Sequence, residues 1–201
     1  MARRRASRKV SMVVGTSGQF LGKRRPSGEL AKKPVVLVLG SQGVGKTSVA
    51  KRLAGDQAKV IRTQALNEAA VSAVRKRKWP EELMLVQSLI LDGPTFLSRR
   101  PGVSRLLISL IRERSEAGLR TVICQKGDDD SILLLCDELS DNTRVLLNLR
   151  FPTGGGQTRF AGKVCDELEI HRRHARELVI SEPWTYLKVI RALHKVKREL
   201  Q

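Results

Sequence analysis

The sequence has few cysteines and no long apolar run. No apolar stretch in its 201 residues approaches the ~20 residues that a membrane-spanning helix needs. The three cysteines, Cys124, Cys136 and Cys165, are scattered without a C-x-x-C pair, which argues against a disulfide framework or a zinc site and favours a reducing compartment. His171 and His174 have no third metal ligand near them. These absences predict a cytoplasmic protein with one α/β domain and a small appendage.

Acidic residues are scarce relative to basic ones. The chain holds 38 Lys or Arg and 20 Asp or Glu, for a formal net charge of +18. Residues 1–33 hold ten basic residues and one acidic residue, and the remainder holds 28 and 19, so each part carries a net charge of +9. This excess favours a polyanionic partner, with nucleic acid ahead of a membrane surface. A merely solubilising surface is the alternative, because charge alone names no partner.

The first part of the chain is predicted to be a basic disordered arm, residues 1–33. It contains Arg3-Arg4-Arg5 and Lys23-Arg24-Arg25 among serines and glycines. A segment that is rich in Arg and Ser and nearly free of acid also fits a mitochondrial transit peptide. No clear amphipathic helix is evident in it, so we favour a tail that binds nucleic acid.

A glycine-rich motif follows the arm. The stretch from Gly40 to Thr47 fits the P-loop pattern G-x-x-x-x-G-K-[ST]. The apolar, β-branched run at 35–39 predicts a buried strand before it, and residues 48–54 predict a helix after it. A strand, a glycine loop and a helix start form a ready anion site. The alternative is a glycine turn that binds nothing.

The P-loop assigns a role to each residue of the motif. Backbone N–H groups would surround phosphate oxygens, Lys46 would reach the β- and γ-phosphates, and the Thr47 hydroxyl would ligate Mg²⁺. The sequence therefore predicts ATP and Mg²⁺ as ligands. The predicted nucleotide-binding residues are Gly40, Ser41, Gln42, Gly43, Val44, Gly45, Lys46, Thr47 and Ser48.

Strands and helices alternate after the motif. We expect strands at 59–63, 88–92, 120–125 and 145–149, and helices at 65–77, 103–117 and 128–139. Such alternation predicts a parallel sheet with helices on both faces. After the glycines at 154–156 only helical stretches follow. The expected fold is therefore α/β, a three-layer P-loop NTPase core at 34–152 with a small helical lid at 153–201.

Three polar side chains near strand ends are candidates for catalysis beside Lys46. Asp92 ends the apolar strand 88–92, as a Walker B acid would, and could hold Mg²⁺ together with Thr47; the alternative is an ordinary Asp-Gly-Pro turn. Gln125 could sense the γ-phosphate or be an ordinary strand-end amide. Arg144 could act as an arginine finger toward a neighbouring subunit, with Arg150 as its competitor.

A basic cluster is the candidate nucleic-acid surface. Arg75, Lys76, Arg77 and Lys78 come at the end of the helix predicted over 65–77. Their charges could contact phosphates, and Trp79 beside them could stack on an unpaired base. Trp79 could equally belong to the core.

The order of these motifs resembles the AAA+ ATPases and, within them, the DnaA-type replication initiators, over residues 34–199. The resemblance is carried by the P-loop, by the strand that ends at Asp92, by the stretch 114–123 and by residues 158–161. It implies ATP and Mg²⁺ binding, self-assembly into a homo-oligomer, and contact of the segment 65–79 with single-stranded DNA.

The chain departs from this family at three places. Gly93 stands where the family has a second Walker B acid, which makes slow hydrolysis the expectation. Leu187 lies at the position of the lid arginine, so Lys188 or Arg191 would have to contact the nucleotide in its place. The chain also leaves no room for the family's helix-turn-helix. A regulator or loader built from the ATPase core fits better than a full initiator.

The preferred function is an ATP-binding AAA+-like ATPase that assembles on, or acts with, DNA in replication initiation, its regulation or loading. A small P-loop kinase is the first alternative, with Arg99 and Arg100 as phosphate clamps. A GTP switch is the second, because the stretch 125–128 resembles a guanine-reading Asn-Lys-x-Asp motif.

Overall fold

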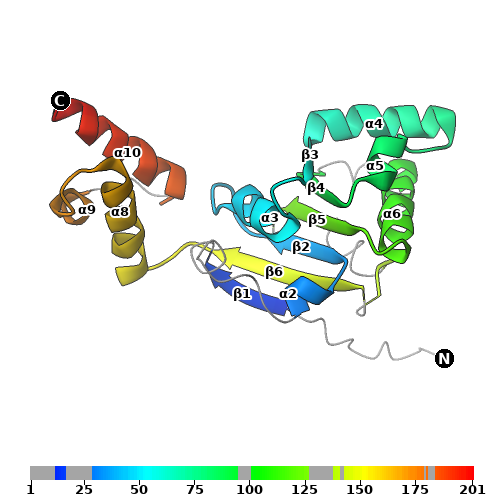
Figure 1. The fold of residues 1–201 in the computed structure, drawn as a ribbon, viewed down its shortest axis with the longest axis horizontal. Helices are drawn as coiled ribbons and strands as arrows, with labels where there is room; N and C mark the ends of the chain where they lie inside the picture. The colour runs from blue at the N-terminus through cyan, green and yellow to red at the C-terminus, as the bar shows by residue number, and fades with distance from the viewer. Residues whose placement is uncertain are drawn as a thin grey trace.

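The fold is built on one parallel β-sheet. The structure, a computed structural model, describes residues 12–16, 29–94, 101–126, 138–140, 143–178, 180 and 184–201. The carboxyl ends of the strands point toward the same side of the molecule (Figure 1). Six strands lie in the order β1-β6-β2-β5-β4-β3, and every neighbouring pair is parallel. Their bounds are β1 Met12–Thr16, β2 Val35–Leu39, β3 Lys59–Arg62, β4 Ser88–Asp92, β5 Arg120–Gln125 and β6 Arg144–Arg150.

Helices cover both faces of the sheet. Because side chains alternate along a strand, Leu37 of β2 packs with Leu66 and Leu107 on one face, while Val36 packs with Val49 on the other. The predicted three-layer α/β fold is therefore confirmed. The helices of the core are α2 Glu29–Lys32, α3 Lys46–Ala54, α4 Thr63–Lys76, α5 Glu81–Leu85 and α6 Pro101–Glu116. The helix predicted at 128–139 lies outside the described residues except for its last two positions.

Two parts of the predicted disordered arm are ordered. Strand β1 pairs with β6 from Met12 opposite Leu146 to Thr16 opposite Arg150. Helix α2 places Leu30, which is 5% exposed, in the core cluster beneath α3. For these residues the prediction of disorder was wrong, because the basic composition masked a short apolar run, Met12-Val13-Val14, that can cover the open edge of β6. Residues 1–11 and 17–28 lie outside the described part of the chain.

A buried arginine fixes the segment that leads into β4. Arg114 of α6 is fully buried and donates to the carbonyl oxygens of Leu83 at 2.6 Å, Met84 at 3.2 Å and Val86 at 2.9 Å. These are carbonyls at the carboxyl end of α5, which have no partner within the helix. Burial lowers the pKa of the Arg114 guanidinium to about 10. This contact anchors the chain two residues before the strand that carries Asp92.

The carboxyl-terminal helices pack into a lid with its own core. These helices are α8 Gly155–Leu168, α9 Arg173–Glu177 and α10 Tyr186–Glu199. In Figure 1 they lie together at the left, on the side toward which the strands point. Phe160 and Tyr186 meet edge to face with ring centroids 4.4 Å apart, and Trp184 packs on both. In the described part of the chain, every helix is too short or too polar to cross a membrane.

Candidate functional site: a P-loop between the core and the lid

The P-loop joins β2 to α3 at the carboxyl edge of the sheet. At Gly40 an added Cβ would lie 2.6 Å from the carbonyl oxygen of Leu149 in β6, so only glycine lets the loop leave the sheet here. At Gly43, where φ is +79°, an added Cβ would lie 3.2 Å from the side chain of Thr185 in the lid. The loop is thus confined between the sheet and the lid, at two positions where a side chain would be crowded.

Lys46 is held over the loop. Its Nζ donates to the carbonyl oxygens of Gly40 and Ser41, each at 2.8 Å. Burial lowers the pKa of the Lys46 ammonium, and the nearby Cys124 and Asp92 partly offset this shift. The ammonium is therefore partly desolvated and bonded to neutral oxygens, which anionic phosphate oxygens could replace with a stronger charge-assisted bond.

Thr47 and Asp92 form the polar pair that the two motifs predicted. The Thr47 Oγ1 donates to the Asp92 Oδ2 at 2.9 Å, across 45 positions in the sequence. A hydroxyl and a carboxylate so close together are ligand types that Mg²⁺ takes alongside substrate phosphates. The residues present therefore fit a magnesium–nucleotide complex, in which the ion would neutralise phosphate charge.

The backbone explains why no acid follows Asp92. Gly93 has φ +75°, and an added Cβ would lie 2.8 Å from the Thr63 Oγ1. That hydroxyl donates to the carbonyl oxygens of Asp92 at 3.1 Å and Gly93 at 2.7 Å. A larger residue would therefore strain the turn and displace Thr63. Among the described residues that line the pocket, Asp92 supplies the only carboxylate.

A pocket of about 690 Å³ opens between these groups and the lid. Gln125, which is 3% exposed, lies on its wall at the end of β5, as the sequence predicted. Cys124 beside it was not predicted, since a lone cysteine in a strand has no sequence signal. Burial, and to a lesser degree Asp92, raises the pKa of the Cys124 thiol. This wall therefore places a buried amide and a buried thiol beside Asp92.

The lid closes the pocket with apolar side chains. Tyr186, Leu187 and Ile190 at the start of α10 line it, whereas Lys188 and Arg191, the predicted lid contacts, do not. Residue positions 187 and 190 share one face of a helix and 188 lies off that face, whereas 191 is a neighbour of 187 around the helix but does not line the pocket. Thr185 caps α10 by accepting a hydrogen bond from the Lys188 N–H at 3.2 Å. Thr185 therefore both caps the helix and lies next to Gly43 of the P-loop.

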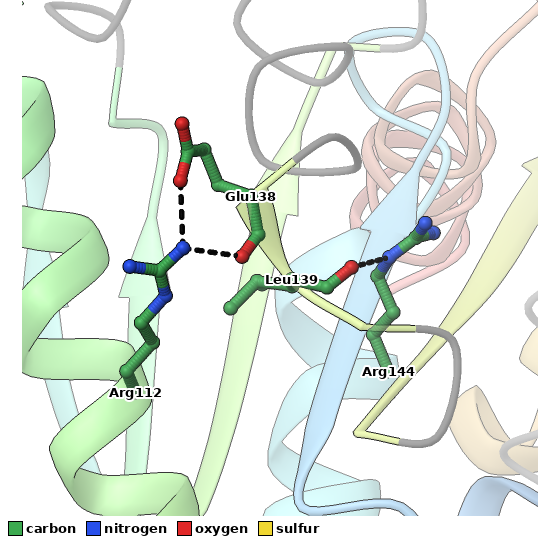
Figure 2. Close-up of polar contacts among 4 residues, drawn as sticks. All are labelled: Arg112, Glu138, Leu139 and Arg144. Atoms are coloured by element: carbon green, nitrogen blue, oxygen red, sulfur yellow. Dashed lines mark hydrogen bonds and ion pairs between the residues drawn. The ribbon is translucent and has the colours of Figure 1, made fainter. Parts of the chain in front are cut away.

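Arg144 is placed differently from the prediction of an arginine finger. It is only 3% exposed, and its Nε donates to the Leu139 carbonyl oxygen at 2.9 Å. Figure 2 shows this bond on one side of the 138–139 segment and Arg112 bound to Glu138 on the other. The guanidinium is used within its own chain to hold this segment at the amino end of β6. Its competitor, Arg150, is exposed at the opposite end of the same strand, beside Gly40 and Ser41.

The predicted nucleic-acid residues are exposed at the carboxyl end of α4. Arg75, Lys76 and Arg77 project into solvent, and Lys78 pairs with Glu81 at 2.8 Å. Trp79 belongs to the core: it is 6% exposed, and its Nε1 donates to the Leu106 carbonyl oxygen at 2.9 Å. The cluster therefore offers charge, while Trp79 offers no exposed face for stacking on a base.

No family model and no curated protein matches the sequence. Solved structures do match its fold. Domain III of the replication initiation protein DnaA from Thermotoga maritima aligns with a TM-score of 0.65 and 17% identity over 85% of this chain and 78% of that one. The chain shares the fold of this domain. A DnaA bound to AMPPCP and single-stranded DNA aligns with a TM-score of 0.64 and 14% identity, over 82% of this chain and 55% of that one.

The likeness extends to other AAA+ folds. A point variant of RuvB from Thermotoga maritima aligns with a TM-score of 0.57 and 18% identity, over 83% of this chain and 55% of that one. At such identities the likeness concerns the fold alone. Because the chain spans only about half the length of two of these proteins, their whole activities do not transfer to it.

Proposed function

We propose that this protein is an AAA+-type ATPase that binds ATP with Mg²⁺ at the P-loop and acts on DNA in replication initiation, its regulation or loading. One observation carries the nucleotide part: Lys46, Thr47 and Asp92 converge at the loop, with the Thr47–Asp92 bond at 2.9 Å. The P-loop motif is contiguous in the sequence, whereas Asp92 lies 45 residues beyond Thr47 and reaches the loop only through the fold. The AMPPCP-bound DnaA of similar fold supports the choice of an adenine nucleotide.

Hydrolysis is proposed to be slow. A water that attacks the γ-phosphate usually needs a carboxylate to orient it. Asp92 already accepts the Thr47 hydroxyl, and the strained turn at Gly93 leaves no space for a second acid. Bound ATP would therefore persist and act as a switch for assembly rather than as fuel for rapid turnover.

The proposed DNA surface is the end of α4, at Arg75, Lys76, Arg77 and Lys78. When exposed cationic side chains bind phosphates, counterions are released from the nucleic acid. The contribution of these side chains to DNA affinity is therefore salt-dependent. A DnaA of the same fold was solved with single-stranded DNA, which favours that form. Self-assembly in the ATP state is also proposed; with Arg144 buried, a different arginine would have to contact the nucleotide of the next subunit.

Equilibrium binding of labelled ATP and GTP, with and without a single-stranded oligonucleotide, tests this function. We expect Mg²⁺-dependent ATP binding, weaker GTP binding, and DNA binding whose salt slope falls when the four α4 cations are replaced by Gln. A preference for GTP would contradict the ATPase in favour of the switch. Transfer of phosphate to a metabolite, indifferent to DNA, would contradict it in favour of a kinase.

A further inference from the structure

A second basic surface lies on the lid, far along the chain from α4. Helices α8 and α9 enclose a groove of about 480 Å³. Arg159 and Lys163 line it from α8, and Arg172 and Arg176 line it from α9. All four are exposed, and no acidic side chain of the described chain lines the groove. The groove therefore concentrates positive charge from two helices in one concave surface.

Most of this charge is not neutralised within the lid. Arg172 forms an ion pair with Asp166, and the hydrogen bond to Asp166 raises the pKa of its guanidinium further. Arg159, Lys163 and Arg176 make no side-chain hydrogen bond or ion pair in the described chain. Three cations thus face solvent in a groove, although acidic residues are present elsewhere on the lid. An anionic ligand would supply the missing counter-charge.

Small residues keep the floor of the groove open. Gly155 and Gly162 lie on the α8 side, and an added Cβ at either would meet nothing within 4 Å. From residue 155 to residue 163 the helix rises about 12 Å, at 1.5 Å per residue. Successive phosphates of one strand lie further apart than their 3.4 Å rise along the duplex axis, so this wall is long enough for about two consecutive phosphates. A single free phosphate would occupy only part of it.

We propose that the α8–α9 groove binds the phosphodiester backbone of a nucleic acid, with Arg159, Lys163 and Arg176 as its phosphate contacts. The surface is distinct from the α4 cluster and does not depend on the P-loop. It rests on the DNA part of the proposed function and adds a contact on the lid. A second copy of this chain fits less well, because each chain carries +18 and two copies would repel. An acidic protein surface is distinguished from a nucleic acid by the competition experiment below.

A matched pair of substitutions at the floor tests the proposal with little risk to folding. Gly162→Glu places a carboxylate in the open groove, and Gly162→Ala is its neutral control; both residues favour helix more than glycine does. Affinity for labelled single-stranded and duplex oligonucleotides is measured by fluorescence anisotropy over a range of salt. We expect Gly162→Glu to bind DNA at least about fivefold more weakly than Gly162→Ala at low salt. Equal affinities would overturn the proposal.

Removal of the cations provides the second test. Arg159→Gln with Arg176→Gln should lower the salt slope of DNA binding by about two, one per lost phosphate contact. An unchanged salt slope in this groove variant would count against the groove. If the groove variant shows a reduced slope and the α4 variant an unchanged one, only the α4 surface would be rejected. Competition by poly-glutamate as effective as that by DNA of equal charge would overturn the phosphodiester assignment. ATP binding, measured in the same samples, reports separately on the P-loop.

Protection of Lys163 from acetylation gives a readout on the unaltered chain. DNA should slow the modification of Lys163 relative to Lys51, an exposed lysine of α3. Equal rates with and without DNA would contradict the proposal even if every variant failed to fold. Protection by single strands only, or by duplex only, identifies which form of nucleic acid the groove accepts.

Discussion

The two walls of the pocket proposed to hold the nucleotide differ in chemistry. The core supplies an ammonium, a hydroxyl, a carboxylate and an amide from Lys46, Thr47, Asp92 and Gln125, whereas the lid supplies apolar surface from α10. The core wall is suited to phosphates and Mg²⁺, and the lid wall is suited to excluding water. We infer that the core wall binds the nucleotide through charged and polar contacts with its phosphates, and that the lid wall contacts it mainly through apolar packing.

The difference has a structural cause on the lid side. Leu187 is 51% exposed and lines the pocket, while Lys188 and Arg191 of α10 do not line it. A lid without a cation at the pocket gains little from the γ-phosphate, because that group interacts mainly through charge. The predictions below break or sharpen this contrast between the two walls.

Loss of the core ammonium should have the largest effect. Lys46→Ala removes the cation from the loop and should weaken Mg²⁺–ATP binding at least about hundredfold, or ~2.8 kcal/mol. Isothermal titration calorimetry measures the change, and Lys51→Ala on the exposed face of α3 is the matched control. Tight ATP binding by Lys46→Ala would show that the core wall does not hold the phosphates.

Crowding the turn after Asp92 should cost stability. Gly93→Ala introduces both a left-handed alanine and a contact of 2.8 Å with the Thr63 Oγ1. Gly118→Ala is its control, because Gly118 has a similar φ of +71° but nothing lies within 4 Å of its added Cβ. We expect about 1–2 kcal/mol of destabilisation for the control and about 1 kcal/mol more for Gly93→Ala. Equal unfolding midpoints in urea for Gly93→Ala and Gly118→Ala would contradict the explanation that crowding at Gly93 excludes a second acid there.

A cation introduced on the lid should make its wall resemble the core wall. Leu187→Arg places a guanidinium at the pocket and should improve the preference for ATP over ADP about tenfold, or ~1.4 kcal/mol. Leu187→Met keeps an apolar side chain of similar volume and serves as the control. If both nucleotides tightened equally, the lid would not contact the γ-phosphate, and its position relative to the core would need revision.

The smallest effect concerns the thiol of the core wall. Burial, helped by Asp92, raises the pKa of Cys124, so little thiolate forms at pH 8. Mass spectrometry after mild alkylation should find Cys124 almost unmodified in the native protein and modified in denaturant. Rapid modification of Cys124 in the native state would mean that this wall is more open to solvent than the structure indicates.

Local motifs made the core wall predictable from sequence. The P-loop fixes Lys46 and Thr47 by spacing, and an acid at the end of an apolar strand indicates Asp92. The parallel order of strands then brings them together at one edge. A contact between Thr47 and Asp92 could therefore be expected from sequence. Its length of 2.9 Å could not, because it depends on the register between β2, β5 and β4.

The remaining features depended on tertiary contacts that no local pattern records. The rotation of α10 decides whether Leu187 or Lys188 faces the pocket. The burial of Trp79 depends on a carbonyl acceptor at Leu106, 27 residues further along the chain, and that of Arg144 on the carbonyl of Leu139, five residues before it. These acceptors make a polar side chain tolerable in the core. Strand β1 was missed because its pairing partner, β6, lies more than a hundred residues away.

A structure of the protein with a non-hydrolysable ATP analogue and Mg²⁺ would test the central claim most directly. The account predicts phosphate oxygens within hydrogen-bond distance of the Lys46 Nζ, and loss of its two bonds to the Gly40 and Ser41 carbonyls. It also predicts the ion beside Thr47 and Asp92. Lys46 still bonded to both carbonyls, with the nucleotide bound elsewhere or absent at saturating concentration, would contradict it.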